Sequence, residues 1–266
     1  RKIRNTFRFL LGNLKDQKLD IKLNSKEIEK WPELERYILH QIFELNKNFE
    51  KYFKEYNFHK LYKELLNFCS LDLSAFYFDI RKDMLYCDDL KSPRRKISTS
   101  LMSVVLDILL KWFAPILSFT TEEIFQIINQ NKRSSIHLES FPKIPASWEN
   151  KKLHEKWEKL KMIRNVVNAG IEEKRSNKDI GSSLEAEIEI YLGEEYLKLV
   201  KDINLSEYFI TSRASVKKML NNDKIFKLND IPNVGVIVEK AKGEKCSRCW
   251  KILGNLCERC SRVAKH

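Results

Sequence analysis

Glycine is scarce in this sequence, and no apolar run is both long and free of charge. Seven glycines among 266 residues leave few positions for tight turns and favour long helices. The most apolar stretch, residues 101–119, contains Asp107 and Lys111 and is interrupted by Pro115. This stretch therefore predicts a buried helix, and we do not expect a membrane protein.

Familiar catalytic and phosphate-binding signatures are also missing. The sequence contains no GxGxxG, GxxxxGK[ST], HExxH or GxSxG motif. Adjacent acids such as Glu122 and Glu123 diverge by about 100° on a helix, so they do not form an acid/base pair. We predict no catalytic residue.

What the sequence has in excess is positive charge. Its 49 basic and 37 acidic side chains give a formal charge of +12, which favours a polyanionic partner such as nucleic acid. A lysine-rich surface that only maintains solubility is the alternative. The 15 Phe, 9 Tyr and 5 Trp residues supply enough bulk for a core and exclude global disorder.

Helical periodicity dominates the first half. The first helix is expected to bury Ile3, Phe7 and Leu10 on one face and to carry basic residues on the other. Further helices are predicted to begin near Pro32, after Asn57, at Ser92-Pro93 and at Thr120.

Two local predictions in this half are specific. Thr120 is expected to cap the last of these helices, with Glu123 completing a capping box and Phe119 packing on Ile124. The segment 75–86 mixes apolar and charged residues and is predicted to be an exposed connection.

The second half changes period from 3.6 to 2. A helix is predicted over 153–174 and a short one over 194–201, with strands over 186–192, 208–216 and 234–238. The fold class is therefore mainly α: an antiparallel helical bundle, then a small α+β domain and a C-terminal zinc knuckle. The predicted domains are residues 1–145, 146–242 and 243–266.

The most specific motif is a pair of CxxC knuckles, Cys246-x2-Cys249-x7-Cys257-x2-Cys260. Two such knuckles present four thiolates to one tetrahedral ion, so we predict one structural zinc ion per chain. Free thiols or a redox pair are the alternative. Four protein ligands leave no coordination position for an activated water, which argues against a catalytic zinc.

Trp250 directly follows the second cysteine of this motif. Its indole either fills the small core of the knuckle or stacks on an unpaired base. The module has few other apolar side chains, which favours the filling role.

Several segments, in order, resemble the C-terminal part of bacterial isoleucyl-tRNA synthetases, which are class I enzymes. They are residues 1–14, 78–87, 92–95, 114–123, 137–142, 180–186 and 243–250. The first and the fourth of these are shared in looser form with valyl- and leucyl-tRNA synthetases. The segment Gly181-Ser-Ser-Leu-Glu-Ala186 and the two CxxC knuckles favour the isoleucine enzymes, although the seven-residue spacer is shorter than is common there.

This resemblance implies a helical anticodon-binding domain and a zinc-binding domain. The HIGH and KMSKS signatures that handle ATP are missing. We therefore expect the ATP-binding catalytic domain and the editing domain to lie upstream of Arg1, and this part alone not to charge tRNA. The expected partners are the anticodon stem-loop of an isoleucine-accepting tRNA and the rest of the synthetase. We expect a cytoplasmic monomer.

Candidate RNA contacts come from the basic segments and the knuckle. They are Arg1, Arg4, Arg8, Arg81, Lys82, Arg94, Arg95, Arg248, Trp250, Lys251 and Arg259. The arginines of the first helix have a second possible role, docking on the catalytic domain. Two other functions remain open from the residues alone: a zinc-ribbon nucleic-acid-binding regulator without enzymatic activity, and a zinc-stapled protein-interaction scaffold.

Overall fold

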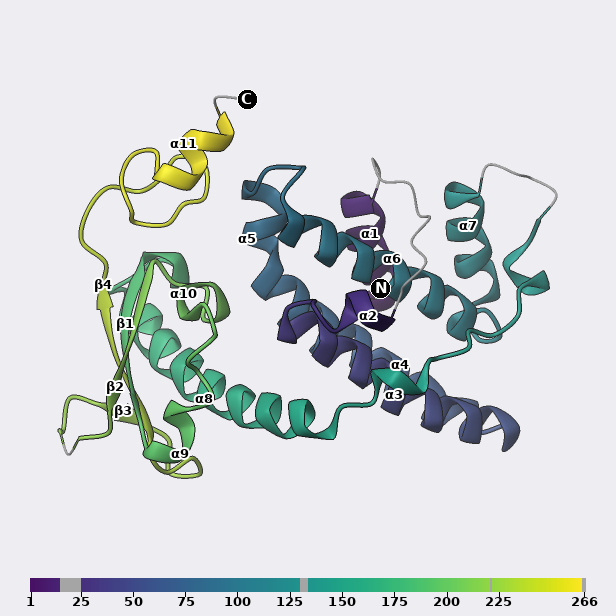
Figure 1. Ribbon diagram of the computed structural model, residues 1–266, viewed down its shortest axis with the longest axis horizontal. Coiled ribbons are helices and arrows are strands. Elements are labelled where there is room, and N and C mark those ends of the chain that lie inside the picture. Colours follow the sequence, from purple (N-terminus) through teal and green to yellow (C-terminus); the bar gives the residue numbers. More distant parts are fainter. Residues whose placement is uncertain (15–24, 130–133, 221, 265–266) are drawn as a thin grey trace. The chain divides into compact units, whose positions relative to one another are not determined.

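A computed structural model describes residues 1–14, 25–129, 134–220 and 222–264 (Figure 1). The described chain is mostly helical, with one four-stranded sheet. The helices are α1 (Lys2–Leu14), α2 (Ser25–Ile28), α3 (Glu33–Lys54), α4 (Phe58–Asn67), η1 (Phe68–Phe78), α5 (Asp79–Cys87), α6 (Pro93–Phe113), α7 (Ser118–Ile128), η2 (Ile136–Leu138), η3 (Ala146–Trp148), α8 (Lys151–Ser176), η4 (Ser183–Glu185), α9 (Glu194–Leu197), α10 (Leu205–Tyr208) and α11 (Glu258–Ala264). The strands are β1 (Ala186–Leu192), β2 (Arg213–Lys218), β3 (Phe226–Lys227) and β4 (Val234–Lys240).

The chain divides into two compact units. The helical unit comprises Arg1–Asp79 and Leu90–Lys151, and the sheet unit comprises Ile80–Asp89 and Lys152–His266. The separation of 146–242 from 243–266 as domains stays a prediction.

Aromatic side chains form the core of the helical unit. Trp112 of α6 stacks on Phe49 of α3 with ring centroids 5.4 Å apart, and Phe113 meets Phe7 of α1 edge-on at 6.2 Å. Phe7, Trp112 and Phe113 are at most 1% exposed. The predicted inward face of the first helix and the inward position of Trp112 are therefore confirmed.

A buried carboxylate joins three helices in this core. Glu35 of α3 is fully buried and accepts hydrogen bonds from Ser98 Oγ of α6 at 2.7 Å and from Tyr77 Oη of η1 at 3.2 Å. Because a buried carboxylate needs such donors, these bonds fix how the three helices meet.

The prediction of an exposed connection over 75–86 is wrong, because helix runs without a break from α4 through η1 to α5. η1 is a π-helix, in which residues five apart share a face. Phe68, Leu73 and Phe78 accordingly fall on one buried line. A search at the α-helical period does not detect that spacing, which is why the segment looked irregular.

The predicted start of α7 is also wrong. The helix begins at Ser118, and Leu117 precedes it without a side-chain cap. Phe119 is 94% exposed, so it does not pack on Ile124, and the Glu123 carboxylate pairs with Arg4 of α1. Thr120 therefore does not cap this helix.

The sheet of the second unit has the order β2-β1-β4-β3. β1 pairs in parallel with β2 and antiparallel with β4, while β3 pairs antiparallel with β4. The strands predicted over 186–192 and 234–238 are confirmed. The strand predicted from Tyr208 begins only at Arg213, because Tyr208 ends the short helix α10.

Helix α8 lies against this sheet (Figure 1). A methyl group added at Gly170 of α8 would lie 2.7 Å from Val236 Cγ1, so only glycine permits this close approach of helix and strand. Among the described residues, no helix is long and apolar enough to cross a membrane.

Gly235 of β4 gives a test of the sheet packing. A Cβ at this position would meet Ile225 Cγ2 and would lie 3.1 Å from the backbone oxygen of Phe226. We expect Gly235→Ala to lower the free energy of unfolding by about 1–3 kcal/mol, as overpacking does, measured by urea unfolding. Gly12→Ala is the matched control, because its Cβ would have no neighbour within 4 Å. It should raise the stability slightly. Equal stability of the two variants would contradict this packing.

Candidate metal centre

The four cysteines of the CxxC pairs come together at one point. Their sulfur atoms all lie within 4.8 Å of one another, and all four residues are buried. The Sγ atoms of Cys249 and Cys257 are 3.7 Å apart. In a tetrahedron of thiolates around zinc, with Zn–S bonds of about 2.3 Å, the sulfur atoms lie about 3.8 Å apart. The cluster could therefore hold a metal ion.

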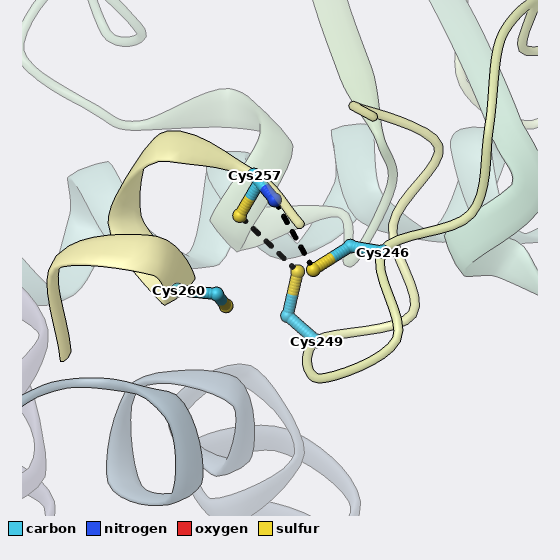
Figure 2. Close-up of side chains that lie close together, drawn as sticks. All are labelled: Cys246, Cys249, Cys257 and Cys260. Atoms are coloured by element: carbon cyan, nitrogen blue, oxygen red, sulfur yellow. Dashed lines mark hydrogen bonds between the residues drawn. The ribbon is translucent and has the colours of Figure 1, made fainter. Parts of the chain in front are cut away.

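Two backbone hydrogen bonds shape the first knuckle, residues 246–251. Cys246 N donates to Lys251 O at 2.8 Å, and Trp250 N donates to Cys246 O at 2.9 Å. Gly254 then turns the chain with a backbone φ of 122°, a value that residues other than glycine rarely adopt. Figure 2 shows the loop of Cys246 and Cys249 facing Cys257, which directly precedes α11, and Cys260 in the first turn of that helix.

The pKa values of the thiols differ within the cluster. Burial alone would raise the pKa of Cys246, but backbone N–H groups of Cys249, Cys257 and Arg248 donate to its sulfur and lower it to about 6. Burial and the neighbouring Cys257 raise the pKa of Cys260 to about 12, and burial also raises that of Cys249. Without a cation, the cluster therefore keeps protons at neutral pH.

A fifth cysteine lies beside these four. Cys87, at the end of α5, is 5% exposed and belongs to the same buried cluster. Burial and the nearby Asp83 carboxylate raise the pKa of its thiol to about 11. Cys87 thus stays a neutral thiol, which suits it to fill space next to the centre.

The expectation that Trp250 fills the knuckle is wrong. The residue is 62% exposed, and its backbone has φ of 65°. This left-handed conformation closes the knuckle turn and leaves the indole on the surface. Cys87 and Ile252, which is 7% exposed, fill the inside instead.

The other knuckle candidates are held within the sheet unit. Arg259 donates to both oxygens of Asp83, at 2.7 and 2.8 Å, and Arg248 donates to Cys87 O. Lys251 is 7% exposed, and its Nζ lies 3.4 Å from Ser206 O.

Arg81 is corrected as a candidate RNA contact. Its guanidinium is buried and donates to Glu207 Oε1 at 2.6 Å, so it does not lie on the surface. Lys82 is half-buried on the same helix. Both residues belong to the sheet unit.

The remaining candidates lie in the helical unit. Arg1 directly before α1 and Arg4 and Arg8 along it are exposed, and Arg4 pairs with Glu123. Arg94 is exposed and Arg95 half-buried in the first turn of α6.

The acidic partners of Arg259 and Arg81 could not be predicted from the sequence. Asp83 lies 176 positions from Arg259, and Glu207 lies 126 positions from Arg81. No local sequence spacing connects residues so far apart. Asp83 was also missed because residues 75–86 were expected to form an exposed connection.

Comparison with known proteins identifies the family. Residues 35–190 match the model of the anticodon-binding domain of tRNA ligase. The chain is 54% identical over 259 residues to an isoleucine–tRNA ligase of Pelagibacter ubique, with 97% of the chain and 27% of that protein covered. It is 38% identical over 260 residues to that of Rhodopseudomonas palustris and 40% identical over 253 residues to that of Bradyrhizobium diazoefficiens.

These last two alignments cover 96% and 95% of the chain, but only 26% and 25% of the relatives. The chain thus spans about a quarter of the length of the curated relatives it matches. Since the family model covers more than half of the chain, the chain belongs to the family of anticodon-binding domains of tRNA ligases.

Proposed function

We propose that this chain is the tRNA-binding C-terminal part of an isoleucine–tRNA ligase, and that it holds the anticodon stem-loop of an isoleucine-accepting tRNA. The observation that carries this proposal is the 54% identity to such a ligase over 97% of the chain. The match to the anticodon-binding domain lies inside the same stretch.

In this proposal, the whole enzyme uses ATP to join isoleucine to its tRNA, and the present part contributes positioning. A tRNA gripped at its anticodon end presents its acceptor end to a distant active site in a fixed orientation. The helices of the first unit would form an antiparallel bundle for this grip. The enzyme would act as a cytoplasmic monomer.

The ion at the four cysteines is proposed to be zinc with a structural role. Thiolates are ligands that zinc prefers, and four of them close its coordination shell. Cys246, Cys249, Cys257 and Cys260 would be the ligands. The module has few apolar side chains, so metal binding would supply much of its folding free energy.

The RNA would be bound by exposed cations and by one exposed aromatic side chain. Arg1, Arg8 and Arg94 are exposed on the helical unit and suit phosphate contacts. Trp250 suits stacking on an unpaired base. A bulky residue in the left-handed region is unfavourable, and glycine would serve the turn better, so the exposed indole at this position points to a role in binding.

Zinc binding should depend on pH. Cys249 and Cys260 keep their protons at neutral pH, so zinc must displace at least these two. Displacing two protons should raise the apparent zinc affinity about 100-fold per pH unit near pH 7. Chelator competition at pH 6.5 and 7.5 measures this change. Affinity that does not vary with pH would contradict thiolate ligation.

Elemental analysis should give about one zinc ion per chain. Cys257→Ser should lose the ion and unfold the module locally while the other helices remain, as circular dichroism would show. Cys69→Ser is the matched control, because this buried cysteine lies in the helical unit, and it should keep the ion.

Binding of tRNA should be selective and sensitive to salt. Four to six phosphate contacts predict a log-log salt slope of about −3 to −4, at roughly 0.7 per contact. Arg8→Gln should reduce this slope by about 0.7. Arg213→Gln is the control, because Arg213 is already paired with Glu187. A slope near zero, or equal affinity for an unrelated tRNA, would refute the proposed function.

Trp250→Ala should weaken tRNA binding by about 1–3 kcal/mol without changing zinc content, because an exposed indole contributes stacking and little to the fold. Filter binding and zinc release to a chelator measure the two quantities. Leu253→Ala is the control, since Leu253 is exposed on the same module. Loss of zinc from Trp250→Ala would show that the indole has a structural role and would contradict this prediction.

A further inference from the structure

Two acidic side chains at the end of α5, Asp83 within the helix and Asp88 directly after it, face the metal module, defined here as residues 243–264. Arg259 forms a two-pronged ion pair with Asp83 and also donates to Asp88 Oδ1 at 3.3 Å. The side chains of Asp83 and Asp88 are only 14% and 13% exposed. An ion pair in which two guanidinium nitrogens donate to one carboxylate is strong, and it fixes the orientation of the two side chains.

Arg248 makes a second connection to the same helix end. It donates to the backbone oxygens of Cys87 and, at 3.3 Å, of Tyr86. Such terminal carbonyls lack partners within their helix and lie at its negative end. Arg248 therefore caps α5.

Both arginines lie between metal ligands in the sequence. Arg248 stands between Cys246 and Cys249, and Arg259 stands between Cys257 and Cys260. Each knuckle thus has its own attachment to α5, and Cys87 fills the space between helix and cluster. Movement of either attachment would displace the cysteines on both sides of it.

We propose that the end of α5 is the docking surface of the metal module and that Asp83 is a positioning residue: through Arg259 it holds the module, slows metal loss and fixes the place of Trp250 for RNA. The effect on RNA rests on the proposed tRNA binding, whereas the effect on metal retention rests only on the proposed zinc site. Because linkage is reciprocal, docking that favours the folded module also favours the bound ion.

The test uses the whole chain loaded with zinc and compares Asp83→Asn with Asp179→Asn. Asp179 pairs with Lys174 elsewhere in the sheet unit, so its variant makes the same chemical change away from the module. The first measurement is the rate of zinc transfer to a chelator, without RNA. Asp83→Asn should release zinc about tenfold faster, as expected for loss of a charged hydrogen bond, and Asp179→Asn should not.

A double-mutant cycle separates docking from a general loss of stability. Arg259→Gln also loses the contact with Asp88, so it should release zinc at least as fast as Asp83→Asn. The double variant should release zinc about as fast as Arg259→Gln alone, because Asp83 acts through Arg259. Asp88→Asn should have a smaller effect in the same direction, since its contact is longer. Unchanged release from Asp83→Asn, or additive effects in the double variant, would overturn the proposal.

The second measurement is tRNA affinity. Removing a negative charge should strengthen RNA binding through electrostatics alone, whereas loss of positioning should weaken it severalfold. We expect Asp83→Asn to weaken binding with an unchanged salt slope. Stronger binding would overturn the positioning role. Failure of the unaltered chain to bind tRNA would instead refute the proposed function and leave the zinc-release result to decide the docking.

Discussion

Four cysteine sulfur atoms held within 4.8 Å of one another cannot all be ionised unless a cation lies among them. Backbone N–H groups lower the pKa of Cys246 to about 6, but Cys260 is raised to about 12. The metal module has little apolar core, so its fold depends on how this repulsion between thiolates is relieved. A bound zinc ion, as proposed, would ionise the thiols and hold both knuckles together.

The surroundings of this cluster hold several basic side chains of the sheet unit. Arg248, Lys251 and Arg259 contact other parts of the sheet unit, and on the sheet itself Lys217 and Lys218 pair with glutamates. Three of these five side chains are thus paired with carboxylates and two with backbone oxygens inside the sheet unit. The proposed RNA contacts are the exposed Arg1, Arg8 and Arg94 of the helical unit, with Trp250 as a stacking residue.

The sequence was informative where structure depends on local spacing. The four cysteines, the inward face of α1 and the strand β1 follow from periods of two to four residues, and all are observed. The π-helical segment η1 was missed because its residues repeat every five positions. The outward position of Trp250 was missed because a neighbour from α5, Cys87, fills the space that the indole was expected to occupy.

The most direct test of the account is a chemical footprint of the zinc-loaded chain on an isoleucine-accepting tRNA. If the chain holds the anticodon stem-loop, backbone and bases of that loop should be protected, and the acceptor end should stay as reactive as in free tRNA. Protection of the acceptor end alone, or the same weak protection along any RNA, would contradict it.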